Sequence, residues 1–176
     1  MKRSKIIGEF EEFSVIAEDN PETRSVYDKS RFGELKNRKF RYSLSEALYL
    51  IDKGLMDVLD GRKKVMETDS FVKKAKKLDL RFWIRYLAYK DMRSRGYIVK
   101  TALKFGADFR VYDRGVKPGE DHAKWVMYAV HEGENFSWYE FSAKNRVAHS
   151  TKKNLLIAIV DDEGDVTYYN INWQRP

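Results

Sequence analysis

Residues 155–160 form an unbroken apolar run, Leu-Leu-Ile-Ala-Ile-Val. A strand that alternates apolar and polar side chains can keep one face in water, whereas a strand that is apolar at every position needs cover on both faces. Such strands lie inside parallel or mixed sheets that carry packed helices. The run therefore predicts an interior strand of a mixed sheet with helices packed on it.

The rest of the C-terminal half is rich in predicted strands. Four further stretches carry strand patterns: residues 97–101, 107–112, 125–130 and 166–173. Ser137 and Glu140 have the S-x-x-E spacing of a capping box, which predicts a helix from there to about Ala148. We therefore expect a C-terminal domain of residues 96–176 that is built on a mixed sheet.

The N-terminal part begins with a different pattern. Residues 8–42 alternate apolar and polar positions in short runs such as EFEEFSVI, SVYD and KFRYS. Asn20-Pro21 and Gly33 interrupt the alternation, as turn residues do. The pattern predicts a small antiparallel sheet.

Two helical patterns follow this sheet. A capping-box spacing from Ser43 to Glu46 opens a short amphipathic helix that stops at Gly54. A second helical stretch begins near residues 68–70, restarts at Asp79 and ends at Gly96. Sheet and helices together predict an N-terminal domain of residues 1–95, so the fold class expected for the whole chain is α+β.

Composition excludes several classes of protein. The 34 Lys and Arg residues exceed the 27 Asp and Glu residues by 7, which favours a polyanionic partner such as nucleic acid. Cysteine is absent and histidine occurs three times, which excludes disulfides and thiol chemistry and argues against a zinc enzyme. The chain has no secretory signal and no apolar run of about 18 residues, so we expect a cytoplasmic protein without a membrane span.

Three polar residues lie where a predicted strand meets a loop. Tyr112 ends one strand, His122 follows a Pro-Gly turn before the next strand, and Lys153 directly precedes the strand of residues 154–160. Other residues of the same types remain as alternatives: His131, His149 and Lys152. Spacing alone does not choose between the two adjacent lysines. Taken singly, such residues are most often a sheet tyrosine, an exposed loop histidine and a solvated lysine.

The chemistry of RNA cleavage gives these three residue types a reason to occur together. RNA carries its own nucleophile, so an enzyme needs a base for the ribose 2′-hydroxyl, an acid for the departing 5′-oxygen and a cation for the phosphorane. A phenol, an imidazole and an ammonium can fill those roles without a metal. A phenol of ordinary pKa near 10 is only about 0.1% ionised at pH 7, and a neighbouring ammonium would favour its ionised form.

The chain resembles the archaeal tRNA-splicing endonucleases over most of its length. The resemblance runs from SLSEALYLIDKGLMDV through YLAYKDMRSRGYIVKTALKFGADFRVYDRG to RVAHSTKKNLLIAIVDDEGDVTYYN. The continuous middle motif, with a downstream histidine and the RVAHS-x-K-K segment, is too long to arise by chance. It implies a C-terminal domain that resembles the restriction-endonuclease-like fold.

The resemblance also assigns roles to the three candidate residues. The family pattern places its catalytic tyrosine in the VY-x-RG element, here Tyr112, and its histidine after the P-G turn, here His122. Its lysine follows the VAHS element, which selects Lys153 over Lys152. The implied reaction cuts precursor tRNA at both exon–intron junctions of a bulge-helix-bulge, needs no metal or cofactor, and leaves 2′,3′-cyclic phosphate and 5′-hydroxyl ends.

Further positions match the family's RNA-binding and assembly features. The family stacks a bulge base between two flat side chains, and Arg146 and Trp173 match those positions. The acidic turn of Asp161, Asp162, Glu163 and Asp165 looks like the loop by which one subunit enters a basic pocket of its neighbour. One trio and one acidic turn per chain imply a homotetramer with the last strand paired edge to edge, and a heterotetramer stays open.

Two other functions compete with this one. A metal-dependent nuclease of the restriction-enzyme type would need acidic ligands around its strands. The chain has no clear Asp followed by a D/E-x-K strand motif, because the carboxylates after residues 155–160 fall in a turn. A non-catalytic RNA-binding subunit is disfavoured because Tyr112, His122 and Lys153 are all present.

Overall fold

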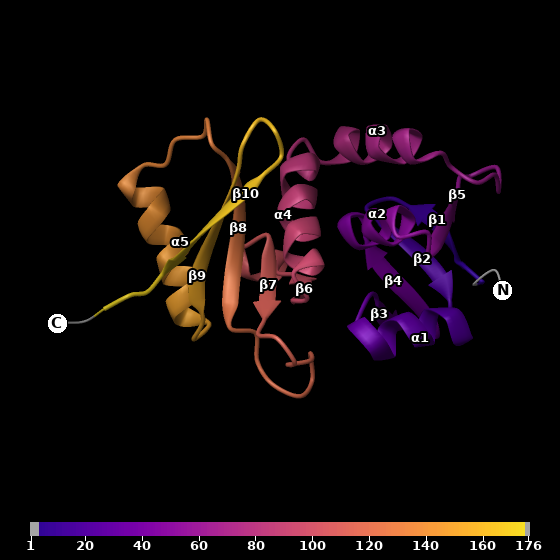
Figure 1. Ribbon diagram of the computed structural model, residues 1–176, viewed down its shortest axis with the longest axis horizontal. Helices are drawn as coiled ribbons and strands as arrows, with labels where there is room; N and C mark the ends of the chain where they lie inside the picture. The colour runs from indigo at the N-terminus through magenta and orange to yellow at the C-terminus, as the bar shows by residue number, and fades with distance from the viewer. Residues whose placement is uncertain (1–3, 175–176) are drawn as a thin grey trace. The chain divides into compact units, whose positions relative to one another are not determined.

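The structure is a computed structural model that describes residues 4–174, and the chain divides into two compact units between Phe82 and Trp83. Each unit contains one five-stranded sheet with both parallel and antiparallel pairs. The described residues also form five α-helices (Figure 1). The α+β class predicted from the sequence is therefore confirmed.

The N-terminal unit is a sheet with three helices. Its elements are, in chain order, β1 (Ile6–Glu11), β2 (Ser14–Glu18), α1 (Pro21–Ser30), β3 (Glu34–Lys36), β4 (Lys39–Ser43), α2 (Leu44–Asp52), β5 (Met56–Leu59) and α3 (Thr68–Leu78). The sheet order is β3-β4-β2-β1-β5, with all pairs antiparallel except β1 with β5. The predicted antiparallel sheet is thus confirmed for four strands, and β5 extends it.

Helix α1 corrects the sequence reading of the stretch SVYD, which predicts a strand there. The side chain of Asn20 accepts a hydrogen bond from Thr23 N at 2.9 Å, and Asn20 N donates to Thr23 Oγ1 at 3.0 Å. Pro21 occupies the start of the helix, where its fixed φ suits the helix and no N–H is needed. The Asn-Pro pair that interrupts the strand pattern therefore begins a helix.

Helix α2 begins at the capping box that the sequence predicts. Ser43 Oγ accepts from Glu46 N at 3.2 Å, and Glu46 Oε2 accepts from Ser43 N at 2.9 Å. The other carboxylate oxygen of Glu46 accepts from Gly33 N at 3.1 Å, so this buried acid also ties the helix to the chain before β3. The prediction of a short helix here is confirmed.

The C-terminal unit carries all the candidate catalytic residues. Its elements are α4 (Phe82–Ser94), β6 (Ile98–Thr101), the 3₁₀ turn η1 (Leu103–Phe105), β7 (Phe109–Tyr112), β8 (Trp125–His131), α5 (Trp138–Ser150), β9 (Asn154–Val160) and β10 (Val166–Ile171). The sheet order is β10-β9-β8-β7-β6, and only β8 and β9 run parallel. The five strands and the helix predicted for this half are confirmed.

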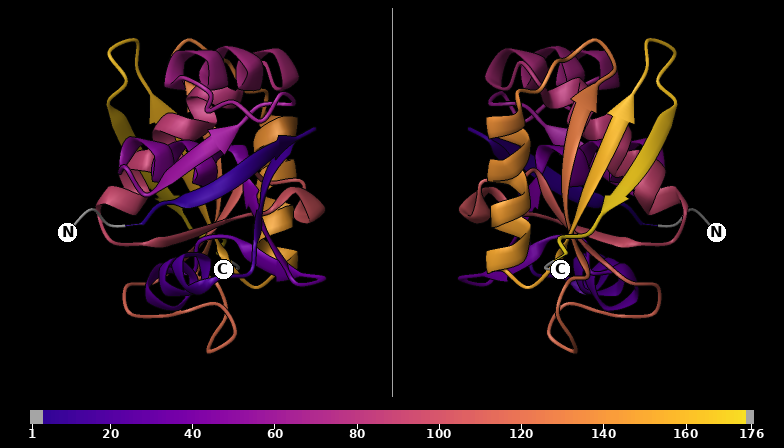
Figure 2. Two further views of the ribbon diagram at one scale, coloured as in Figure 1. Left: turned by 90° about the vertical axis from the view of Figure 1, so that its right-hand side faces the viewer. Right: turned by 90° about the vertical axis from the view of Figure 1, so that its left-hand side faces the viewer.

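Helices α4 and α5 cover opposite faces of this sheet (Figures 1 and 2). Ala148 of α5 packs in one cluster with Val126 and Leu155, whereas the ring of Tyr89 in α4 lies 5.6 Å from that of Phe109. Strand β9 is covered on both faces and lies between β10 and β8. The interior strand predicted from residues 155–160 is therefore confirmed.

The division between the units falls earlier in the chain than residue 96, where the sequence places the start of its second domain. Helix α4 belongs with the C-terminal unit because its side chains bind that unit's sheet. Arg85 Nε donates to Asp108 Oδ1 at 2.7 Å, and Tyr168 Oη of β10 donates to Asp91 Oδ2 at 2.8 Å. Burial and this hydrogen bond to Asp91 raise the pKa of Tyr168 above its ordinary value.

Asp108→Ala is expected to lower the free energy of unfolding by about 3 kcal/mol. Asp108 is 6% exposed and accepts hydrogen bonds from Arg85 and, at 2.9 Å, from Ala129 N. The variant removes a charged acceptor from both donors inside the unit. Urea denaturation followed by circular dichroism measures the loss. Lys5→Ala breaks the exposed Lys5–Asp57 pair and should cost less than about 1 kcal/mol, so equal losses would contradict the expectation.

Candidate active site

The end of β7 and the starts of β8 and β9 lie side by side at one end of the strands of the C-terminal sheet, and we call this end the sheet edge. Backbone hydrogen bonds continue the strand pairing there: Lys124 N donates to Val111 O at 2.9 Å, and Asn154 N donates to Lys124 O at 3.0 Å. Tyr112, Lys124 and Lys153 therefore follow one another across three adjacent strands. The structure thus brings two of the predicted catalytic residues, Tyr112 and Lys153, to the same edge.

Tyr112 is the last residue of β7 and is held by the sheet on both sides. It pairs with Ile98 of the edge strand β6, and Val111 beside it pairs with Trp125 of β8. Only 5% of Tyr112 is exposed. The sheet therefore fixes the position of this residue.

His122 lies on the exposed connection between β7 and β8, which starts and ends at the same sheet edge. Lys124 Nζ donates to Asp113 Oδ2 at 2.7 Å and so links the two ends of the connection. This hydrogen bond from Lys124 holds the pKa of Asp113 below its ordinary value. His122 N donates to Asp121 Oδ1 at 2.6 Å, while the imidazole is exposed.

Lys152 and Lys153 take different positions at the end of α5. Lys152 has a positive φ of 54° and donates from its N to His149 O, so it reverses the chain out of the helix. Lys153 N then donates to Ala148 O at 2.9 Å, and Lys153 Nζ donates to Thr151 O at 2.9 Å. Lys153 is half-buried at the entrance to β9, whereas Lys152 is exposed.

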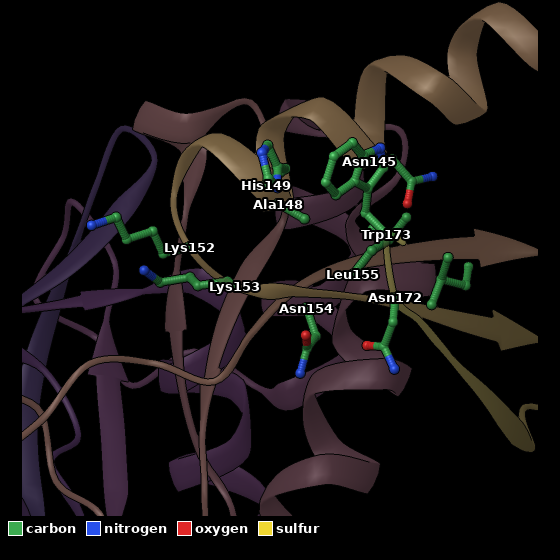
Figure 3. A pocket seen from close by; sticks show the side chains of 10 residues that line it. Asn145, Ala148, His149, Lys152, Lys153, Asn154, Leu155, Asn172 and Trp173 are labelled. Carbon is green, nitrogen blue, oxygen red and sulfur yellow. The ribbon is translucent and has the colours of Figure 1, made fainter. Parts of the chain in front are cut away.

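A groove runs along the C-terminal half of α5 and the residues that follow β10, and we call it the α5 groove. Two adjoining hollows form it and share five lining residues: Asn145, His149, Ile171, Asn172 and Trp173. Lys153 lines one hollow and Arg146 lines the other, and Figure 3 shows the hollow that contains Lys153. Within the described part of the chain, Tyr112 and His122 do not line the groove.

The two predicted base-stacking residues both line this groove. Trp173 is 56% exposed, and its ring centroid lies 4.5 Å from that of His149. The guanidinium of Arg146 lies 5.9 Å from the centroid of the Tyr139 ring. One flat apolar ring and one flat cation therefore face a common open space.

His131 and the acidic turn lie at the opposite edge of the sheet, because β8 and β9 both end there. His131 is the last residue of β8, whereas Tyr112 lies beside the start of that strand. His131 Nε2 lies 2.9 Å from Asp162 Oδ1. Asp161 Oδ1 accepts from Glu163 N and Asp165 N at 3.0 and 2.9 Å, which shapes the turn. Asp162 and Glu163 remain exposed.

The groove contains polar residues that the sequence did not single out as functional. Asn145 Nδ2 donates to Phe141 O at 3.0 Å, which orients the amide, and Asn172 lies across the groove. Asn145 lies four residues before His149, one of the alternative histidines, and this spacing on a predicted helix indicates that the two share a face. Among residues 4–174, no group of three or more His, Asp or Glu side chains lies close enough to hold a metal ion.

None of the helices in residues 4–174 combines the length and the apolar composition that crossing a membrane requires.

Comparison with protein families assigns both units. The family model of the tRNA intron endonuclease N-terminal domain matches residues 6–72. The family model of the tRNA intron endonuclease catalytic C-terminal domain matches residues 82–168. The second match begins at the division between the two compact units. The two matches together cover most of the chain.

Individual relatives extend over the same region. A tRNA-splicing endonuclease of Nanoarchaeum equitans is 50% identical over 139 residues, which cover 76% of this chain and 88% of the relative. That of Thermococcus onnurineus is 45% identical over 150 residues, or 85% of each chain. That of Pyrococcus furiosus is 40% identical over 161 residues, or 92% of each chain. This chain belongs to the tRNA intron endonuclease family.

Proposed function

We propose that the protein cuts precursor tRNA at bulge-helix-bulge exon–intron junctions, without a metal ion, and leaves 2′,3′-cyclic phosphate and 5′-hydroxyl ends. One observation carries the proposal. The residues that the sequence resemblance selects as catalytic, Tyr112, His122 and Lys153, all belong to the ends or connections of β7, β8 and β9 at one sheet edge. In this proposal, a single phosphodiester at that edge contacts all three side chains.

Each residue has a role that its position supports. Tyr112 is the base that removes the 2′-hydroxyl proton, and the surrounding sheet holds it in place. His122 is the acid that gives a proton to the departing 5′-oxygen, and its exposed connection lets it approach the substrate. The half-buried Lys153 stabilises the negative charge of the phosphorane.

The α5 groove supports the proposed mode of RNA binding. A bulge base has two π-faces, and it can stack on the Trp173 indole while the Arg146 guanidinium covers the other face. Stacking of this kind does not depend on which base is present. The groove reaches Lys153, so a base held there lies close to the cleavage site.

The proposal gives the two units different roles. The C-terminal unit is a mixed sheet between α4 and α5, and we propose that it is a nuclease domain with a restriction-endonuclease-like fold. The N-terminal unit serves assembly. Chemistry by 2′-hydroxyl attack also separates this protein from restriction-type nucleases, which use metal-bound water.

A cleavage assay in EDTA tests the proposed reaction. The purified protein is incubated with a bulge-helix-bulge RNA, and the 3′ ends of the products are analysed for cyclic phosphate. We expect cutting at both junctions without added metal. Cutting only after a divalent cation is added would support the metal-dependent alternative, and tight RNA binding without cutting would support the non-catalytic subunit.

We also propose that four copies of the chain form the active particle. In the described sheet, β10 is an outermost strand and pairs only with β9. Its other side has no paired strand, so β10 of a second copy can pair with it and extend the sheet. The exposed Asp162 and Glu163 give the acidic turn the charge to enter a basic pocket of another copy. A heterotetramer with a second, structural chain is the competing arrangement.

Light scattering is expected to give a molar mass of four times the 20.8 kDa chain. Neutralising the acidic turn should lower that mass toward two chains, because it removes the proposed contact between pairs. Three residues are changed together: Asp162→Asn, Glu163→Gln and Asp165→Asn. Asp161 stays, because its side chain shapes the turn.

A matched control removes three exposed acids from the N-terminal unit, by Glu34→Gln, Glu67→Gln and Asp69→Asn. This control should keep the mass of the unaltered protein. A mass of one chain for the unaltered protein, or the same mass for the acidic-turn variant, would contradict the proposed assembly.

A further inference from the structure

We propose that His149 is a positioning residue that holds the indole of Trp173 in the orientation needed to stack on an RNA base. The inference rests on the proposed function, in which Trp173 is one wall of the base-binding site. It adds a residue of α5 to that site and gives it a specific task, the orientation of a ring on another segment.

The contact between the two rings is the first observation. Their centroids lie 4.5 Å apart at an interplanar angle of 41°, and this separation is at the short end of the range for favourable aromatic contacts. Figure 3 shows the two rings side by side over the end of α5, with Lys152 and Lys153 extending away from them. Both His149 and Trp173 line both hollows of the α5 groove.

The two residues differ in how firmly their backbones are held. His149 lies within α5, and its carbonyl accepts the hydrogen bond from Lys152 N that ends the helix. Trp173 lies beyond the end of β10, and no regular backbone pairing holds its segment within residues 172–174. The helix residue is therefore the fixed partner, and the tryptophan is the one that needs orienting.

Orientation matters because stacking requires one particular plane. An exposed indole that rotates freely must lose that freedom when a base binds, and the loss reduces affinity. A ring contact made before binding removes part of this cost. The contact should therefore act on RNA affinity and not on the chemical step at Tyr112, His122 and Lys153.

A fluorescence measurement tests the ring contact without RNA. Acrylamide quenching is compared between the unaltered protein and His149→Ala, each with and without Trp173→Phe, so that the Trp173 signal is obtained by difference. We expect His149→Ala to make Trp173 more accessible to the quencher. His149→Phe restores a ring and should return quenching toward the original value, whereas His149→Gln should not. Unchanged quenching in His149→Ala would overturn the inference.

Cleavage kinetics test the consequence for RNA. His149→Ala should raise KM about threefold to tenfold with kcat at saturating RNA unchanged, as expected for the loss of one aromatic contact. His149→Phe should restore KM, and the neighbouring control Ser150→Ala should not alter it, since Ser150 Oγ donates to Val147 O on the helix itself. An RNA that lacks the base at the stacked position should show no difference between unaltered protein and His149→Ala.

The outcomes separate this inference from the proposed function. A fall in kcat with unchanged KM would place His149 in the chemistry and overturn the positioning role. An equal KM increase on the RNA that lacks the base would also overturn it. Failure of the unaltered protein to cut the RNA at all would instead contradict the proposed function, while the quenching result would still report the ring contact.

Discussion

A bulge-helix-bulge RNA with 2′-deoxyribose at one junction is expected to remain uncut at that junction and to be cut normally at the other. The proposed reaction uses the 2′-hydroxyl as its nucleophile, so its removal leaves nothing that can attack the adjacent phosphorus. The groups at the sheet edge then have no proton to take and no phosphorane to stabilise. Gel separation of the labelled fragments measures both junctions in one reaction.

The unaltered junction serves as the control within the same molecule. It shows that the modified RNA still folds and binds, so a loss confined to the deoxy junction reports chemistry. Equal cutting at both junctions would mean that water or another external nucleophile attacks. That result would remove the role proposed for Tyr112.

His122→Ala is expected to lower kcat by about two to four orders of magnitude, the usual contribution of a positioned acid or base. Without the imidazole, the 5′-oxygen must leave without a proton from the protein. KM should change little, because His122 lies on the β7–β8 connection and not in the α5 groove. Single-turnover cleavage with saturating protein measures the rate of the chemical step.

Glu120→Ala alters an exposed side chain on the same connection and serves as the matched control, with an expected kcat close to the original. Imidazole added to the solution should partly restore the rate of His122→Ala by supplying the missing acid. A rate near that of the unaltered protein in His122→Ala would show that another group protonates the leaving oxygen. His149, the histidine of the groove, would then be the first residue to examine.

Local signals in the sequence predict much of the fold. The side chains of Ser43 and Ser137 form the capping boxes that start α2 and α5, and both interactions lie within a few residues of the chain. The Asn20-Pro21 signal is equally local, but it fits either a turn or the start of a helix. Interpreted as a turn, it does not predict α1. Short-range patterns therefore fail where one motif serves two structures.

Interactions between distant residues explain why the division between the units lies before α4 and not after it. Helix α4 joins the C-terminal unit through Arg85 with Asp108 and Asp91 with Tyr168, pairs that are 23 and 77 residues apart. No pattern within α4 reveals those partners, so the end of the helix looks like a domain boundary. The site also depends on distant residues, because β8 lies between β7 and β9 and its register with both strands places Tyr112 and Lys153 at the same end of the strands.

The groove residues show the limit of motif recognition. Family resemblance selects Tyr112, His122, Lys153, Arg146 and Trp173 as candidates, and their roles stay predictions. In the sequence, His149 is only one of the alternative histidines, and its place near the end of a predicted helix indicates no contact with a distant ring. Only the fold shows its ring against a residue that follows β10.

The parallel pairing of β8 with β9 has a consequence for protein synthesis. Parallel neighbours require a crossover, so the chain must pass through α5 before Lys153 can lie beside Lys124. A nascent chain still emerging from the ribosome can already contain the tyrosine and the histidine while its sheet edge lacks the ammonium. Under the proposed roles of these residues, we expect cutting activity only after β9 has been synthesised.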